Sequence, residues 1–234
     1  MKRLAIRTLL AASAWLANQV CLAGGLEQFT GDEIANALRS SLRQGAVNAV
    51  VKLAKPDAFF ADPKLRIPLP EPMQKAEGTL RTIGMGKELD ALETAMNRAA
   101  EAAIPKAKKL VLGAVTKMTV ADAKAIFSGP DDAVTQFFRK HTERELQADF
   151  LPAVSKVVQR VELAGRYNKV VERAAAFGLL EQAKSVENYV TRKALNGLYA
   201  TMAEEERALR KDPVKATTNL LKKVLESIRF GTGN

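Results

Sequence analysis

Two acidic runs carry the side chains most able to catalyse a reaction. Asp131 and Asp132 form the first run, and Glu204, Glu205 and Glu206 form the second. Two such carboxylates facing each other across a cleft, about 5–9.5 Å apart, could serve as the acid and base of a glycan hydrolase or a lyase. Both runs also have structural explanations, and we favour these.

For Asp131 and Asp132 the favoured explanation is a helix start. Pro130 just before them is typical of a first helical turn, where negative charge is stabilised by about 0.3–1 kcal/mol. A carboxylate there can also accept hydrogen bonds from free backbone amides. The alternative is that the two aspartates supply half of the oxygen ligands of a Ca²⁺ or Mg²⁺ ion, but the spaced oxygen ligands of a calcium loop are absent from this segment.

The glutamate run is predicted to be a solvated face of a helix. Consecutive helical positions point about 100° apart, so three adjacent glutamates do not converge on one ion. Glu206 and Arg210 have the i,i+4 spacing of a helical ion pair. The alternative is that Glu204 or Glu205 faces inward and holds Arg98 or Arg139.

A polar trio interrupts an alanine-rich helix. Asn97, Arg98 and Glu101 alternate there with small residues that let neighbouring helices approach closely. We therefore predict that the trio is trapped at a packed interface, with Arg98 and Glu101 as a buried i,i+3 pair. The alternative is a ligand-binding role, for which Asn97, Arg98 and Arg139 are candidates together with Asp131 and Asp132.

Most other catalytic chemistry is excluded by composition. The chain has one Cys and one His, so it offers neither a two-histidine zinc motif nor a thiolate metal cluster. His141 is expected to be a surface histidine. Residues 84–86 read Gly-Met-Gly but lack the Lys-Ser/Thr of a phosphate loop, and no Gly-x-Ser-x-Gly elbow occurs. No catalytic residue, metal or cofactor is predicted, and we expect the protein not to be an enzyme.

A proline-rich connection over residues 56–70 supplies apolar candidates. Its four prolines oppose both helix and sheet, so the segment is expected to lie extended over the helices. If it closes a groove for an apolar ligand or a partner, the contacting side chains are Phe59, Phe60, Ile67 and Leu69. The alternative is that these four side chains fill gaps in the core.

Residues 1–23 have the three-part order of a secretory signal peptide. A positive start is followed by an apolar stretch and by Cys21-Leu22-Ala23, whose small residues suit cleavage after Ala23. We therefore expect residues 24–234 to form a single helical domain in the periplasm. Lipidation at Cys21 is less favoured because Val20 precedes it, and no later stretch is apolar enough to span a membrane.

The positive charge is spread along the chain. The formal net charge is +10, and removal of residues 1–23 takes away three positive charges to leave +7. No basic stripe stands out, so no nucleic-acid partner is predicted. Weak attraction to an anionic lipid or polymer remains compatible with this charge.

Caps and apolar stripes predict an all-α fold of about eight or nine helices. Residues 30–33 read Thr-Gly-Asp-Glu, a capping box ahead of an i+4 stripe that ends before Pro56. Further starts are predicted at residues 142–145, at Ser185 and at Asp212-Pro213. Pro105 is expected to restart or kink one helix, and Pro152 to bend another. No alternating strand is found.

Several motifs in one order resemble a known bacterial family. They are Ile67-Pro68-Leu69-Pro70, residues 96–101, residues 129–133 with Thr135, Phe137, Phe138 and Arg139, and the C-terminal set 203–206, Arg210, 212–213, 217–218 and 220–224. Together they resemble domain-of-unknown-function family 4197. The resemblance implies an exported, mostly helical protein of Gram-negative bacteria, with no established activity and no catalytic residue to carry over.

These observations favour a non-enzymatic envelope protein that binds a protein partner or an apolar ligand. The alternative is an envelope hydrolase or lyase that uses paired carboxylates from the two acidic runs. A helical assembly protein is a third hypothesis, and the oligomeric state is left open by the sequence.

Overall fold

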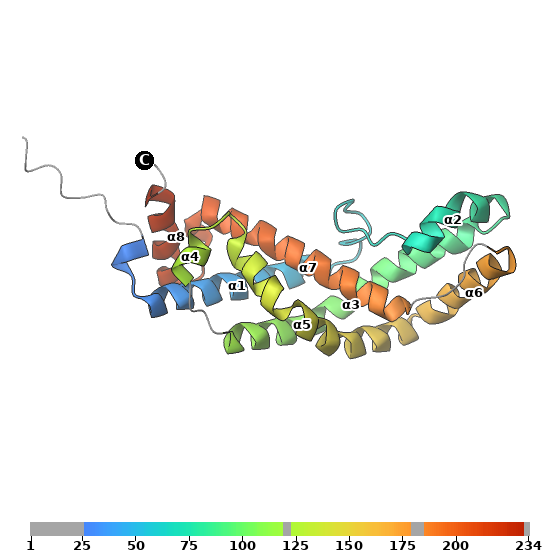
Figure 1. The fold of residues 1–234 in the computed structure, drawn as a ribbon, viewed down its shortest axis with the longest axis horizontal. Helices are drawn as coiled ribbons and strands as arrows, with labels where there is room; N and C mark the ends of the chain where they lie inside the picture. The colour runs from blue at the N-terminus through green and yellow to red at the C-terminus, as the bar shows by residue number, and fades with distance from the viewer. Residues whose placement is uncertain (1–25, 119–122, 179–184, 232–234) are drawn as a thin grey trace, which may run out of the picture.

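The computed structural model describes residues 26–118, 123–178 and 185–231. Four long helices run along the longest axis of the molecule (Figure 1): α1 (Gly31–Leu53), α3 (Gly86–Lys117), α5 (Ala133–Arg160) and α7 (Val186–Lys211). The expected signal peptide and Cys21 lie outside the described residues.

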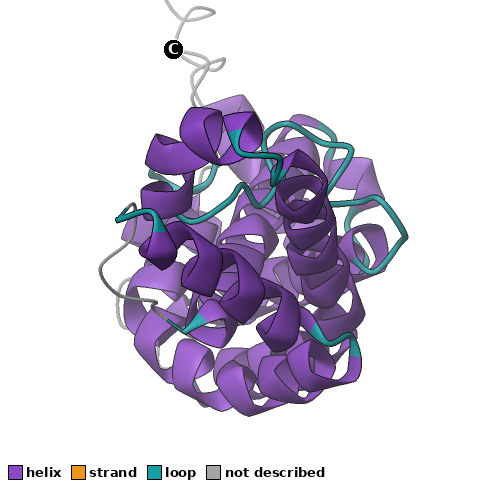
Figure 2. Cartoon of the chain, turned by 90° about the vertical axis from the view of Figure 1, so that its right-hand side faces the viewer, coloured by secondary structure: helices purple, strands orange, loops and turns teal. Residues whose placement is uncertain are grey.

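Shorter helices cover the two ends of this bundle. α2 (Glu71–Thr82) and α6 (Leu163–Ala176) lie at one end, and α4 (Ala123–Phe127) and α8 (Asn219–Gly231) lie at the other (Figure 1). Two 3-10 turns, Leu26–Gln28 and Pro213–Lys215, complete the elements. Over the described ranges the chain contains helices and loops and no strand (Figure 2), which confirms the all-α prediction. No helix among the described residues has the length and apolar character needed to cross a membrane.

The start of α1 follows its predicted capping box. The Thr30 hydroxyl accepts the Glu33 amide N–H at 3.2 Å, and the Glu33 carboxylate accepts the Thr30 N–H at 2.8 Å. The predicted stripe behind this cap is buried, including Ile34 and Leu38. α1 also packs closely against α7, where a Cβ added to Gly45 would lie 3.6 Å from the Met202 carbonyl oxygen. Local sequence therefore determined both the first residue and the buried face of this helix.

Two predicted helix starts are wrong. α5 continues through residues 142–145, where the sequence predicts a helix start, and α3 continues through Pro105 without the restart that was one of the two expectations there. The Thr142 hydroxyl donates to the Phe138 carbonyl one turn earlier, at 2.7 Å, and is buried rather than capping. Asp212-Pro213 opens a 3-10 turn, and α8 begins only at Asn219.

Candidate functional site

The apolar candidates of the proline-rich connection lie mostly in the core. We call residues 54–70 the strap. Phe59, Ile67 and Leu69 are buried, whereas Phe60 is half-buried beneath the Arg66 guanidinium, 4.3 Å from its ring centroid. The Phe59 ring lies against α7 so closely that a Cβ on Gly197 would stand 2.6 Å from it. These side chains anchor the strap to the bundle.

The polar trio of α3 holds the backbone of the strap. Asn97 is fully buried; its amide oxygen accepts the Ile67 N–H at 2.9 Å and its amide nitrogen donates to the Ile67 carbonyl at 2.9 Å. Glu101 accepts the Phe59 N–H at 3.1 Å. Arg98 donates to Glu101 at 2.8 Å and to Asp57 at 2.6 Å. The predicted Arg98–Glu101 pair is confirmed, with its carboxylate end buried, and the trio serves to fix an irregular segment.

The acidic pair before α5 does not cap that helix. α5 begins at Ala133, and Asp132, the residue before it, makes no side-chain hydrogen bond to the amides of the first turn. Asp131 and Asp132 both pair with Arg207 of α7 instead, Asp131 at 3.2 Å from Nε. The capping prediction is wrong because a third carboxylate, from α7, occupies the free amides.

That third carboxylate is Glu206. It accepts the Val134 N–H at 3.1 Å and both the N–H and the hydroxyl of Thr135 at 2.8 Å. Arg210 donates two hydrogen bonds to the same Glu206 oxygen, at 3.1 and 2.9 Å, and a third to the Phe127 carbonyl at 2.8 Å. Burial raises the pKa of the Glu206 carboxyl, while Arg210 and the Thr135 donors act in the opposite sense. The i,i+4 pair is confirmed, but it is buried.

The prediction of a solvated glutamate face holds only for Glu204, which is exposed. Glu205 is buried and accepts from Asn48 at 2.7 Å while pairing with Lys52, both on α1. The alternative partners for this run were Arg98 and Arg139, whose ion pairs are made with other carboxylates. The run thus links three elements, because adjacent positions on α7 point toward different neighbours.

Arg139 joins α5 to α7. Its Nη2 donates to Glu143 at 2.9 Å and to Asn196 at 2.8 Å, and its guanidinium lies 5.4 Å from the Tyr199 ring centroid. Of the nine predicted binding residues, only Asp131 lines any of the three recesses considered below. The sequence identified the polar residues that hold the fold together, and it missed the largest of these recesses.

All three tyrosines of the chain are expected to titrate late. Burial is the main cause in each case, raising the pKa values of Tyr167 and Tyr189 and raising the pKa of Tyr199 to about 12. Above about pH 10 the unfolded chain therefore loses phenol protons that the folded chain keeps, so stability falls as the pH rises. We expect less phenolate absorbance near pH 10 in the folded protein than in the urea-unfolded chain, and a Tyr199→Phe variant without the highest step. Phenolate absorbance near pH 10 equal to that of the unfolded chain, while the helical circular dichroism is intact, would contradict this.

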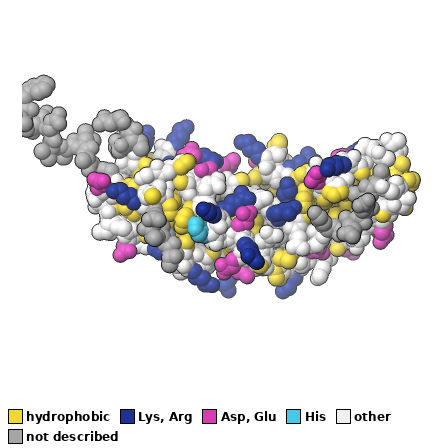
Figure 3. Space-filling model, in the orientation of Figure 1, with side chains coloured by type: hydrophobic (Ala, Val, Ile, Leu, Met, Phe, Trp, Pro, Cys, Tyr) yellow, Lys and Arg dark blue, Asp and Glu magenta, His cyan; other side chains and the backbone are white. Residues whose placement is uncertain are grey.

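The largest of the three recesses is a groove of about 480 Å³ between α3 and α5. The side chains of Leu110, Ala114, Met118, Phe137 and Leu146 give it an apolar floor. Around this floor stand Lys109 and Lys117 on α3, and His141, Glu145 and Asp149 on α5. We call this recess the α3/α5 groove. In the space-filling view, His141 and neighbouring apolar side chains lie together on one exposed face (Figure 3).

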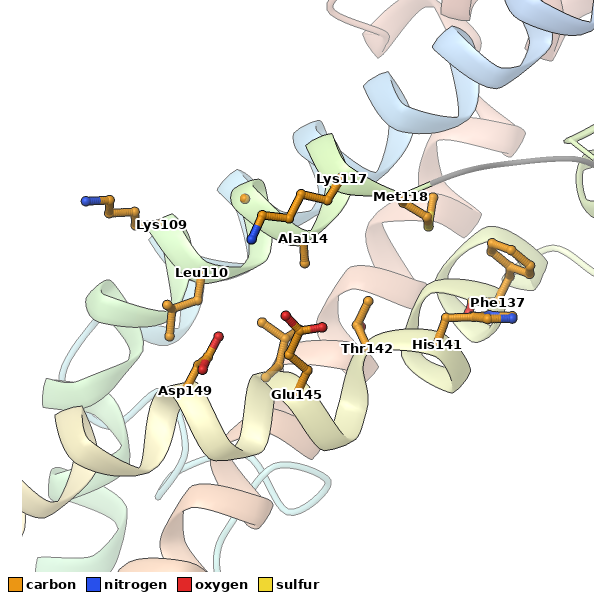
Figure 4. Close-up of a pocket in the computed structure, with 12 residues that line it drawn as sticks. Lys109, Leu110, Ala114, Lys117, Met118, Phe137, His141, Thr142, Glu145 and Asp149 are labelled. Atoms are coloured by element: carbon orange, nitrogen blue, oxygen red, sulfur yellow. The ribbon is translucent and has the colours of Figure 1, made fainter.

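Charged side chains of opposite sign stand on the two rims of the α3/α5 groove. Figure 4 shows Glu145 and Asp149 reaching from α5 toward α3, and Lys117 reaching from α3 over the groove. None of Lys109, Lys117, Glu145 and Asp149 forms an ion pair with another described residue. The groove therefore presents an apolar strip between a cationic rim and an anionic rim.

His141 adds a polar edge but no metal site. Its Nδ1 lies 2.8 Å from the Phe137 carbonyl, and its ring packs on the Phe137 ring at 4.2 Å between centroids. It is exposed, as the sequence predicted. No group of three or more metal-ligating side chains is found in the part of the chain that the structure describes.

Two smaller recesses each contain an ion pair of the fold beside charged side chains that pair with no other described residue, Lys211 in one and Lys169 and Glu172 in the other. One lies beside Asp131, Arg207 and Arg210, whose ion pairs are described above. The other, between the start of α3 and α6, contains the Glu88–Arg173 pair at 4.0 Å. In the α3/α5 groove, by contrast, the four charged rim residues have no ion-pair partner among the described residues.

A sequence signal for the α3/α5 groove exists in hindsight. On α3 the lining positions have the i, i+4, i+7, i+8 spacing of one helical face: residues 110, 114, 117 and 118. On α5 the lining positions recur at every fourth residue: 137, 141, 145 and 149. Spacing marks a face but does not say whether another element covers it.

Comparison with known proteins identifies a family. No curated protein and no solved structure matches this chain. A family model described as a protein of unknown function, DUF4197, matches residues 28–226, which is most of the chain and runs through all four long helices to the middle of α8. The chain therefore belongs to the DUF4197 family, as its motifs indicated.

Proposed function

We propose that this chain is a non-enzymatic binding protein of the cell envelope, whose α3/α5 groove docks a helix from a protein partner. The observation that carries the proposal is the combination of an apolar floor with four charged rim residues that no described side chain pairs. Charges committed to the fold stabilise it, whereas uncommitted charges around an apolar strip are available to a ligand.

The shape of the groove favours a helix over a small apolar molecule. The lining residues follow two long helices for about three turns, and an amphipathic helix can lie along such a channel with its i, i+3, i+4 and i+7 side chains on the floor. An enclosed apolar cavity would suit a lipid tail better. An apolar ligand contacting Phe59, Phe60, Ile67 and Leu69 stays a prediction, and it would have to displace the strap because three of these side chains are buried.

The hydrolase alternative has weaker support. Asp131 and Asp132 are held by Arg207, and Glu205 and Glu206 are held by cations and amide donors. A general acid and base must exchange protons with substrate, so carboxylates committed to these partners are poor candidates. Envelope location rests on the leader-like residues 1–23, and N-terminal sequencing of the protein purified from its host should find Gly24 first.

A groove-filling substitution tests the docking proposal. The probe is a fluorescein-labelled synthetic helix with leucines at i, i+3, i+4 and i+7 and neutral side chains elsewhere. We expect saturable anisotropy with wild type, and binding at least about tenfold weaker with Ala114→Trp, because the indole occupies the floor. Ala148→Trp, at an exposed position of α5 outside the groove, is the matched control and should bind like wild type. Equal binding by all three proteins, with unchanged melting temperatures, would refute docking in this groove.

A further inference from the structure

The two rims of the α3/α5 groove differ in sign, and each has a defined spacing. Lys109 and Lys117 are eight residues apart on α3, which separates their Cα atoms by about 12 Å along that helix. Glu145 and Asp149 are four residues apart on α5, which separates theirs by about 6 Å and puts both on one face. The α5 rim is therefore a short row of carboxylates, whereas the two lysines of the α3 rim stand about 80° apart around their helix axis.

α3 and α5 run in opposite directions along the groove. Figure 4 shows Leu110 opposite Asp149 at one end, where the Lys109 side chain points away from α5, and Met118 near Phe137 at the other end. The carboxylates of Asp149 and Glu145 thus face the α3 rim along its length. They do not close onto Lys109 or Lys117, because the strip formed by Leu110 and Ala114 lies between the rims.

Resting on the proposed docking function, we infer that the partner helix has an acidic edge that faces Lys109 and Lys117 and a basic edge that faces Glu145 and Asp149. A helix whose apolar face lies on the floor has two edges, one toward each rim. Opposite charges at these edges form ion pairs in a setting partly shielded from water, whereas like charges are repelled. The rims therefore select the charge pattern of the partner, and the floor supplies the apolar contact.

The opposite signs of the two rims, which we call the charge order of the groove, have a geometric consequence for the partner helix. Turning a helix end for end while its apolar face stays down exchanges its two edges. A helix with one acidic and one basic edge therefore always has one direction that satisfies both rims. A helix with two edges of the same sign satisfies one rim and is repelled by the other in either direction.

Three synthetic helices with one common leucine face test the inference. The first has a glutamate edge and a lysine edge, the second has two glutamate edges, and the third has two lysine edges. With wild type at low salt, we expect the mixed helix to bind about tenfold tighter than either of the others. Because the difference is electrostatic, it should shrink as ionic strength rises.

Charge reversal of one rim should switch the preference. The variant Lys109→Glu/Lys117→Glu makes both rims acidic, so the helix with two lysine edges should become the tightest ligand. The matched control is Lys106→Glu/Lys108→Glu, which changes the net charge equally at exposed positions of α3 outside the groove and should keep the wild-type preference. Melting temperatures of both variants verify that each is folded.

The two proposals fail in different ways. If the three helices bind wild type equally and Ala114→Trp still weakens all of them, the groove docks helices but the charge order is refuted. If both charge variants shift the preference alike, net charge explains selection and the inference is refuted. If Ala114→Trp weakens none of the helices, docking in the groove is itself refuted.

Discussion

Replacing Glu206 with alanine should destabilise the protein by about 3–5 kcal/mol, the largest effect that we expect from a single polar substitution. The change removes the acceptor of the Val134 and Thr135 amides and leaves the largely buried Arg210 side chain, 11% exposed, without its carboxylate partner. Loss of one partner from a buried ion pair typically costs this much. Urea unfolding followed by circular dichroism measures the change in the free energy of unfolding.

A second substitution separates the two causes. In the double variant Glu206→Ala/Arg210→Met, the buried cation is gone but the first-turn amides of α5 still lack an acceptor. We expect it to recover part of the lost stability. Glu204→Ala, at the exposed neighbouring position, is the matched control and should change stability by less than about 0.5 kcal/mol. If Glu206→Ala were as mild as Glu204→Ala, the network would not stabilise the start of α5.

Asn97→Leu should release the strap at a cost of about 2–4 kcal/mol. Leucine has the same branching and number of side-chain heavy atoms as asparagine but offers neither the acceptor nor the donor that pairs with the Ile67 backbone. A buried N–H and a buried carbonyl are then left unsatisfied, at about 1–3 kcal/mol each before relaxation. Amide hydrogen exchange at Ile67 and limited proteolysis within residues 54–70 should both accelerate more than at α1.

Two further variants calibrate this effect. Asn97→Asp keeps an acceptor for the Ile67 N–H but sets a buried carboxylate oxygen against the Ile67 and Glu93 carbonyls, so it should destabilise the protein at least as much as Asn97→Leu. Asn36→Ala, which loses only an exposed hydrogen bond to Arg39, should have little effect. Unchanged exchange at Ile67 in Asn97→Leu would mean that Phe59 and Leu69 hold the strap without this clamp.

The helices could be predicted because their causes are local. The capping box at Thr30 and the cap at Ser185, which accepts the Asn188 N–H at 3.2 Å, lie within a few residues of the helix starts that they define. The wrongly predicted helix start at Thr142 shows the limit of local signals. The Thr142 hydroxyl donates to the Phe138 carbonyl one turn earlier and lies 3.4 Å from the hydroxyl of Tyr199, a residue far away in sequence.

The site residues were harder to assign because their partners are distant in sequence. Asn97 meets Ile67, and Glu206 meets Thr135, at separations that no local spacing rule covers. Asp131 and Asp132 have the sequence of a cap, but Arg207 and Glu206 from α7 compete for the same positions. The residue types indicated that these side chains would form hydrogen bonds or ion pairs. Which partners they have was decided only by their neighbours in the folded structure.

From its amino-acid order alone, this chain determined its helical class, its family and several of its helix starts, because periodicity, caps and prolines act within one or two turns. Tertiary structure alone decided which polar side chains form hydrogen bonds and ion pairs within the protein and which remain available to a ligand. Lys117 and Glu145 look no different in sequence from the charged residues that form ion pairs elsewhere. Their distinction arises because α3 and α5 flank an apolar strip that keeps opposite charges apart.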